Sequence, residues 1–220
     1  MINLKGLKKD GDNIVLWSGG LDSTYLVWYL LEHGYQVSTR YVEIQNNADK
    51  VKQELKAREN ILPLFRSYKN YRYDSIALSY NEERITESSM CFKQLPLFVF
   101  ACASLSHSDA ILISYVLNDD AISYISEFKK IYNSFMLLSK DSFKIAKLHF
   151  PLITEQKERF INELPIEILK HVTWCENPKE DGTICNDCAP CKRYYFLKDR
   201  INYCINPKPI EEIPCILEEK

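Results

Sequence analysis

Short runs of apolar residues alternate along this chain with longer stretches in which apolar residues recur every three or four positions. The short runs predict strands at 13–17, 36–42, 75–78, 110–116 and 143–149. The longer stretches predict helices at 23–32, 48–66, 92–104, 122–137, 155–164 and 190–201. Strands separated by helices in this way are typical of an α/β protein with a doubly wound parallel sheet. Ligands of such sheets bind beyond the carboxyl ends of the strands, so we expect chemistry after Trp17, Val42 and Val116.

A glycine turn joins the first expected strand to the first expected helix. It comprises Ser18, Gly19, Gly20, Leu21, Asp22, Ser23 and Thr24. Such a turn directs free backbone N–H groups and the positive end of the helix dipole at one point, which suits a phosphate group. Gly19 and Gly20 lack the Cβ atoms that would block close approach of the backbone, and the hydroxyls add donors. We therefore expect these residues to bind a nucleotide.

The carboxylate of Asp22 is the unusual member of this turn. Beside bound phosphates it is repulsive unless a cation lies between them, so we expect it to hold Mg²⁺ or to cap the helix. The turn is not a Walker A loop, because no Gly-Lys-Ser/Thr follows it. A plain glycine turn before a capped helix is the simpler alternative.

Four of the eight cysteines lie close together near the C-terminus, at Cys175, Cys185, Cys188 and Cys191. Two ligands separated by two residues can hold one metal ion, and four thiolates with no open position describe a structural zinc site. A [4Fe–4S] cluster is the competing interpretation, and free thiols are the third. The remaining cysteines have no ligand spacing and are expected to be buried small apolar residues: Cys91, Cys102, Cys204 and Cys215.

The composition limits the classes of protein that fit. The chain has 220 residues, a formal net charge of −2 and an isoelectric point near 6.1. Nucleic-acid-binding proteins are usually basic, so this charge gives no strong signal that the protein binds nucleic acid. Residues 1–13 contain no apolar signal segment, and the apolar stretch at 95–105 is too short to span a membrane. We expect a cytoplasmic protein with an α/β domain at 1–170, a zinc-binding helical appendage at 171–204 and a tail at 205–220.

The string Ser-Gly-Gly-x-Asp-Ser at the glycine turn resembles the pyrophosphate loop (PP-loop) of N-type ATP pyrophosphatases. Together with the four cysteines, it makes residues 14–196 resemble the 7-cyano-7-deazaguanine synthases, the QueC-like family. The resemblance implies an adenine nucleotide alpha hydrolase-like fold, a structural zinc ion and the use of ATP. It also implies a ligase reaction in queuosine biosynthesis. In that reaction 7-carboxy-7-deazaguanine is adenylated, ammonia gives the amide, and a second activation and dehydration gives the nitrile.

The resemblance also implies which residues are catalytic. Asp22 and Ser23 match the loop, and Lys157 matches a lysine at a helix start that follows a Pro-Leu pair, here Pro151 and Leu152. A solvated helix residue is the simpler interpretation of Lys157.

Four further positions are expected to contact the carboxylate substrate. Gln45 stands where the family has Tyr-Gly-Gln after the second strand, and Asp120 and Tyr124 keep the family's Asp-x-x-x-Tyr spacing. Lys93 lies near the place of a family arginine and could neutralise a carboxylate or phosphate, without arginine's bidentate fork. A turn former at Asp120 and a core residue at Tyr124 are the alternatives.

The chain departs from the family pattern on the substrate side. About three residues are missing between Tyr124 and Phe128, and Tyr194 stands where an arginine is expected, with Arg193 one place early. The ATP half of the site is therefore expected to be intact and the acceptor half altered. The expected partners are a small carboxylate and ammonia, and a homodimer is compatible with the sequence.

Other functions stay open at this point. The chain could adenylate a different carboxylate or a carboxylate on a protein. It could also modify or thiolate a tRNA base, although clustered thiols that hold a metal are not available for thiolation. A module that binds ATP without turnover is the third alternative, against which the retained Asp22 and Ser23 argue.

Overall fold

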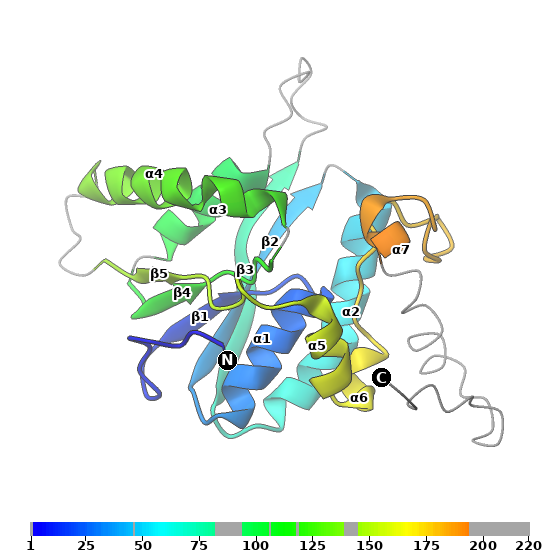
Figure 1. Cartoon of the computed structure of the whole chain (residues 1–220), viewed down its shortest axis with the longest axis horizontal. Helices are drawn as coiled ribbons and strands as arrows, with labels where there is room; N and C mark the ends of the chain where they lie inside the picture. Colours follow the sequence, from blue (N-terminus) through cyan, green and yellow to red (C-terminus); the bar gives the residue numbers. More distant parts are fainter. Residues whose placement is uncertain are drawn as a thin grey trace, which may run out of the picture.

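The structure is a computed structural model, and it describes residues 2–45, 47–81, 94–105, 107–117, 119–138 and 145–193. Within these ranges the strands are β1 (Asn13–Leu16), β2 (Val37–Gln45), β3 (Tyr71–Asn81), β4 (Ala110–Leu112) and β5 (Lys147–His149). The helices are α1 (Leu21–Glu32), α2 (Ala48–Arg66), α3 (Gln94–Ser104), the 3-10 helix η2 (Asp120–Tyr124), α4 (Ile125–Leu138), α5 (Lys157–Glu163), α6 (Ile166–Leu169) and α7 (Ala189–Arg193). The expected alternation of strands and helices is confirmed (Figure 1).

The strands form one parallel sheet in the order β3-β2-β1-β4-β5. The chain winds outward from the central β1 to β3 and then returns to β4 on the other side of β1. The direction of winding therefore changes between β1 and β4, and ligands of doubly wound sheets bind at this switch point. The expected doubly wound α/β fold is confirmed.

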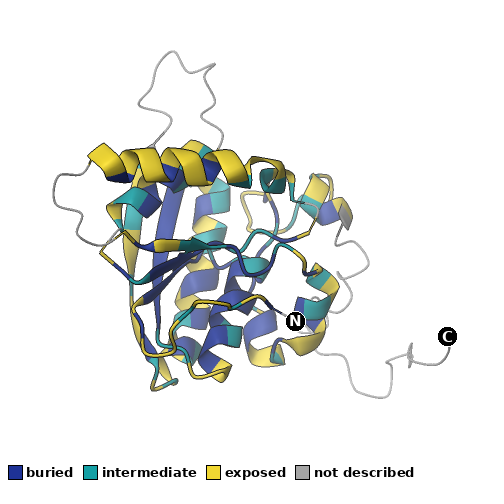
Figure 2. Cartoon of the chain, turned by 60° about the vertical axis from the view of Figure 1, so that its left-hand side comes forward, coloured by how far each residue is buried: buried dark blue, intermediate teal, exposed yellow. Residues whose placement is uncertain are grey.

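Both faces of the sheet are apolar, as the alternation along its central strand shows. Val15 and Trp17 belong to the core under α1, α2 and α5, whereas Leu16 belongs to the core under α3 and α4. Figure 1 shows these two groups of helices on opposite sides of the sheet. In Figure 2 the buried residues are concentrated in the strands and on the inward sides of the helices. A parallel sheet that is covered on both faces has continuous apolar strands, which explains the short apolar runs in the sequence.

Strand β3 is longer than the sequence pattern predicts, because it begins at Tyr71 instead of 75. Polar residues at its start hide the strand pattern. One of them, Asp74, accepts hydrogen bonds from Thr39 Oγ1 at 2.7 Å and from Arg58 Nη2 at 2.6 Å. The Asp74 carboxylate therefore has hydrogen-bond partners inside the sheet, and these partners are distant in the sequence.

Helix α2 has the predicted bounds although Pro63 lies inside it. Proline removes one helical hydrogen bond, but Ile61 and Phe65 on either side of it are completely buried. Tertiary packing therefore keeps the helix continuous.

None of the helices that the structure describes is both long enough and apolar enough to cross a bilayer. The last described helix, α7, ends at Arg193. The rest of the helix expected at 190–201 lies outside the described residues. The expected division into domains stays a prediction.

Candidate functional site

A cavity of about 520 Å³ opens at the carboxyl ends of β1, β2 and β4, at the switch point of the sheet. Residues from the glycine turn, the end of β2 and helices α2, α3, η2 and α5 line it, together with the segments before η2 and around the cysteines. They are Ser18, Gly20, Leu21, Asp22, Val42, Ile44, Lys50, Glu54, Gln94, Phe98, Ser114, Tyr115, Asp119, Asp120, Ala121, Lys157, Thr173, Trp174, Cys175, Glu176, Ala189 and Pro190. The cavity is large enough for a small-molecule ligand.

The glycine turn forms the floor of this cavity and is held by its own hydroxyl groups. Ser23 Oγ donates to the carbonyl oxygen of Gly20 and accepts from the N–H of Ser18, both at 3.3 Å. Thr24 Oγ1 accepts from Trp17 Nε1 at 3.0 Å. Ser23 and Thr24 are buried and, like Gly19, do not line the cavity. Their side chains therefore support the turn, while its other expected residues face the cavity.

Gly19 is the position at which the turn requires glycine. Its φ of +82° is unfavourable for other residues, and a Cβ atom there would lie 3.0 Å from Ala57 Cβ and 3.1 Å from the carbonyl oxygen of Glu54. The turn therefore lies directly against α2.

Lys157 joins two carboxylates at the edge of the cavity. Its Nζ lies 2.7 Å from Asp22 Oδ2 and 3.8 Å from Asp119 Oδ1, and all three side chains are mostly buried. Asp119 Oδ2 also accepts from the N–H of Val116 at 2.9 Å, which fixes the carboxylate just beyond β4. Asp22 lies in the first turn of α1, and Gly20 occupies the N-cap position, so Asp22 does not cap the helix.

Of the four expected acceptor residues, the structure describes three and brings one of them to the cavity. Asp120 lines the cavity, but Gln45 and Tyr124 do not. The side chain of Gln45 donates to Glu43, and Tyr124 is 48% exposed, which also excludes the core position considered for it. Lys93 lies outside the described residues.

An apolar wall of the cavity was not expected from the sequence. Val42 and Ile44 at the end of β2 form it with Phe98 and Tyr115. Val42 belongs to the core under α3 and α4, and the other three pack against that core. The alternation along β2 is the available signal, because residues two apart in a strand share a face.

Helix α2 contributes a carboxyl group and an amine that sequence analysis also missed. Glu54 accepts a hydrogen bond from Tyr41 Oη at 2.6 Å, and burial raises the pKa of the Glu54 carboxyl. Lys50, one helical turn earlier, pairs with Glu176. Ionisable groups therefore also lie on the α2 side of the cavity.

The four cysteines meet in one cluster, with all their sulfur atoms within 4.8 Å of one another. Cys175 Sγ lies 4.0 Å from Cys188 Sγ, and Cys185 Sγ lies 3.9 Å from Cys191 Sγ. Four thiolates at about 2.3 Å around one tetrahedral ion have sulfur separations of about 3.8 Å. The cluster could therefore bind zinc, whereas a cubane whose irons each take a different cysteine separates the sulfurs more widely.

The electrostatics of the cluster differ between its exposed and buried thiols. The N–H groups of Cys188 and Asp187 donate to Cys185 Sγ at 3.2 and 3.4 Å and lower the pKa of its thiol to about 6. Burial raises the pKa of the Cys175 and Cys191 thiols. A bound cation would supply the charge that the buried thiolates need.

A family model described as "Queuosine biosynthesis protein QueC" matches residues 12–195. The chain belongs to the QueC family. The matched range includes the glycine turn, Lys157 and all four cysteines, so the candidate site and the cysteine cluster both lie within the QueC part of the chain. Membership supports an ATP-using enzyme of the ATP pyrophosphatase kind.

Curated relatives are named as tRNA-modifying enzymes. The chain is 28% identical over 191 residues to the tRNA-specific 2-thiouridylase MnmA of Helicobacter acinonychis (strain Sheeba), covering 78% of this chain and 55% of the relative. It is 29% identical over 191 residues to MnmA of Helicobacter pylori (strain ATCC 700392 / 26695), with the same coverage. This QueC family member thus spans about half the length of the curated relatives it matches.

Among solved structures, a predicted subunit of tRNA methyltransferase from Methanocaldococcus jannaschii matches with a TM-score of 0.43 and 13% identity, over 69% of this chain and 72% of that one. NMN synthetase from Francisella tularensis matches with a TM-score of 0.38 and 15% identity, over 93% and 90%. Both similarities to the QueC family member are distant.

Proposed function

We propose that this protein uses ATP to adenylate a carboxylate, with 7-carboxy-7-deazaguanine as the substrate. A carboxylate oxygen attacks the α-phosphorus of ATP and pyrophosphate leaves, which converts a poor leaving group into AMP. Ammonia then attacks the acyl carbon, AMP leaves, and the amide forms. A second ATP activates the amide oxygen in the same way, and loss of AMP with two protons gives the nitrile.

The observation that carries this proposal is the arrangement of Asp22, Lys157 and the glycine turn at one cavity. Backbone N–H groups at the start of α1 suit the phosphates of ATP. Lys157 Nζ, 2.7 Å from Asp22, provides a positive charge at the same place. Pre-arranged charges of this kind stabilise the charge that develops during phosphoryl or nucleotidyl transfer.

The charge balance of the cavity supports a need for Mg²⁺. Among the described residues that line it, two lysines, Lys50 and Lys157, face five carboxyl groups, those of Asp22, Glu54, Asp119, Asp120 and Glu176. ATP adds further negative charge. The oxygen donors of Asp22 and Asp119 fit a magnesium ion, and Mg²⁺ would neutralise the phosphates when bound. Asp22 and Asp119 would then hold the ion, with Lys157 between their carboxylates.

The apolar wall supports a flat acceptor. Val42, Ile44, Phe98 and Tyr115 offer an apolar and aromatic surface, and Asp120 lies on the same cavity. A planar deazapurine needs such a wall and a few polar groups for its edge. Because Gln45 and Tyr124 do not line the cavity, we assign neither of them to the acceptor.

Thiolation of tRNA is the second candidate, because the curated relatives are named 2-thiouridylases. Thiolation requires a reactive thiol. Of the cysteines that the structure describes, four share the cluster, and Cys102 is completely buried with a pKa raised by burial. The clustered thiols are not available for sulfur transfer when they hold a metal ion, and Cys102 is inaccessible, which favours adenylation of a small carboxylate.

The test is product analysis with ATP, Mg²⁺, ammonium and 7-carboxy-7-deazaguanine. We expect AMP and pyrophosphate, with amide or nitrile seen by mass spectrometry. Asp22→Asn should reduce AMP formation about a hundredfold or more, because it removes charge stabilisation. Asp49→Asn, a carboxylate on α2 outside the cavity, is the matched control and should retain activity.

Other products would contradict the proposal in distinct ways. Release of ADP and phosphate would exclude adenylation. If 7-carboxy-7-deazaguanine stays unchanged and another carboxylate causes AMP release, the reaction is still an adenylation but the proposed substrate is wrong. AMP release that requires tRNA and sulfide would favour the thiolation candidate, and tight ATP binding without turnover would favour a binding module.

A further inference from the structure

The segment that carries the first cysteine of the cluster is hydrogen-bonded directly to the glycine turn. The N–H of Thr173 donates to the carbonyl oxygen of Gly19 at 3.1 Å, and the N–H of Leu21 donates to the carbonyl oxygen of Thr173 at 3.2 Å. Thr173 and Gly20 thus pair like residues of two parallel strands. Only Trp174 separates Thr173 from Cys175, the first residue of the cluster, which is 2% exposed. The turn and the cluster are therefore parts of one continuous structure.

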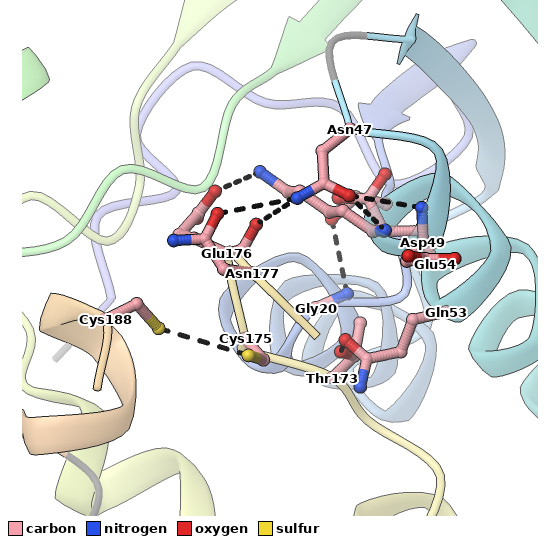
Figure 3. A network of polar contacts seen from close by, with 12 residues as sticks. Gly20, Asn47, Asp49, Gln53, Glu54, Thr173, Cys175, Glu176, Asn177 and Cys188 are labelled. Carbon is pink, nitrogen blue, oxygen red and sulfur yellow. Dashed lines mark hydrogen bonds and ion pairs between the residues drawn. The ribbon is translucent and has the colours of Figure 1, made fainter. Parts of the chain in front are cut away.

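Helix α2 holds the same segment from the other side, as Figure 3 shows. Gln53 accepts a hydrogen bond from Thr173 Oγ1 and donates to the carbonyl oxygen of Gly182 at 3.5 Å. Asn47 donates to the carbonyl oxygen of Glu176 at 3.2 Å, and Lys50 pairs with the Glu176 carboxylate. These contacts attach both ends of the loop between Cys175 and Cys185 to α2.

The same helix also limits the position of the glycine turn. Gly19 lies so close to Ala57 and Glu54 that an added Cβ atom would be crowded at 3.0–3.1 Å. Asn47 caps α2 by accepting hydrogen bonds from the N–H groups of Asp49 and Lys50, both at 3.1 Å. The glycine turn is consequently held between α2 and Thr173. A shift of the cysteine segment has to move either α2 or the turn, because packed elements do not deform freely.

We propose that metal in the four-cysteine cluster and ATP at the glycine turn are coupled, and that Thr173 and Gln53 are the positioning residues that couple them. Metal binding fixes Cys175 and, through Thr173, the backbone of Gly19 to Leu21. The turn then presents its N–H groups to phosphate in one arrangement. Coupling of two sites is reciprocal, so ATP strengthens metal binding by the same factor by which metal strengthens ATP binding. This inference rests on the proposed function only in taking ATP as the ligand of the turn.

The test measures zinc affinity of the full-length protein by competition with a chromophoric chelator, with and without a non-hydrolysable ATP analogue and Mg²⁺. We expect the analogue to tighten zinc binding by about fivefold or more. The affinity of the analogue for zinc-loaded protein should exceed that for stripped protein by the same factor. The zinc measurement alone decides the question if the stripped protein does not stay folded.

Two neighbouring residues of α2 give a matched pair of variants. Gln53→Ala removes the contacts to Thr173 and Gly182, and we expect it to reduce the coupling factor towards one while zinc still binds. Lys52→Ala removes a side chain that is 72% exposed and pairs with Asp49, and it should keep the wild-type factor. Thr173→Val, which keeps the backbone contacts, should give an intermediate factor.

Equal zinc affinity with and without bound analogue would overturn the coupling and leave the proposed function standing. A wild-type factor in Gln53→Ala would overturn its assignment as a positioning residue. Failure of the analogue to bind the zinc-loaded protein would overturn both proposals. AMP release, measured separately, reports on the proposed function alone.

Discussion

At the scale of single residues, Glu54 connects helix α2 to the candidate site. It lines the cavity and lies under the glycine turn, and Tyr41 Oη donates to it at 2.6 Å. Burial raises the pKa of its carboxyl despite the neighbouring Lys50. A carboxyl group with a raised pKa favours its protonated form in the folded state.

We predict that Glu54 makes the protein less stable as the pH rises. Because its folded pKa lies above the ordinary value of 4.5, the folded state binds the proton more tightly than the unfolded state. The free energy of unfolding therefore falls from about pH 4.5 upwards and levels off above the folded pKa. Glu54→Gln, which can still accept from Tyr41, should remove this decline. Urea unfolding of both proteins over a pH series measures it.

The exposed Glu59 on the same helix provides the control, as Glu59→Gln. Its pH profile of stability should be parallel to that of the wild type. A parallel profile for Glu54→Gln as well would show that burial at this position does not affect the carboxyl.

At the scale of elements, the sequence predicted those helices and strands whose formation depends on residues close together in the chain. The strand–turn–helix unit from β1 to α1 follows from one apolar run, two glycines and one amphipathic stretch. The start of β3 was missed because Asp74 is satisfied by Thr39 and Arg58, which are far away in the sequence.

The same limit applies to the candidate site. Lys157 was expected through resemblance, and the structure brings it to Asp22, but the sequence favoured Asp120 over its neighbour Asp119. Which of two adjacent carboxylates faces a lysine depends on the path of the chain after β4. The wall at Val42 and Ile44 likewise depends on where α3 packs. Sequence therefore identified the glycine turn and the cysteines, and long-range contacts determined the rest.

The close approach of the glycine turn to α2 gives a prediction about Gly19. Gly19→Ala should lower the free energy of unfolding by about 1–3 kcal/mol more than Gly34→Ala does. Both glycines have positive φ, +82° and +77°, so both variants share the backbone strain. An added Cβ atom has neighbours within 4 Å at Gly19 and none at Gly34, so the difference between the two variants measures that contact. Chemical denaturation gives both values, and equal losses would contradict close packing.

At the scale of the whole molecule, the cavity lies where the two apolar cores meet. Leu21 belongs to the core under α1, α2 and α5, and Val42 belongs to the core under α3 and α4, yet both line the same cavity. We expect the nucleotide on the side of the glycine turn and the acceptor against the wall of the other core. Changes confined to α3 should then alter acceptor choice without changing ATP binding.

The cysteine cluster gives the last prediction, because it attaches the C-terminal part of the described chain to α2. A structural zinc ion contributes on the order of 10 kcal/mol to the ordering of its local fold. Cys188→Ser should therefore lose bound zinc, and proteases should cleave it between residues 171 and 193. Cys102→Ala is the matched control, since this buried cysteine lies outside the cluster, and it should keep one equivalent of zinc and resist cleavage there.

Metal analysis of the wild-type protein checks the identity of the ion. Zinc without visible absorbance is expected, because sulfur separations of 3.9 and 4.0 Å suit one shared tetrahedral ion. Iron with acid-labile sulfide would replace zinc by an iron–sulfur cluster, and it would require the cysteine segment to open relative to this structure. Retention of zinc and protease resistance in Cys188→Ser would show that three cysteines suffice. The cluster would then be a site with one exchangeable ligand position, and not a closed structural site.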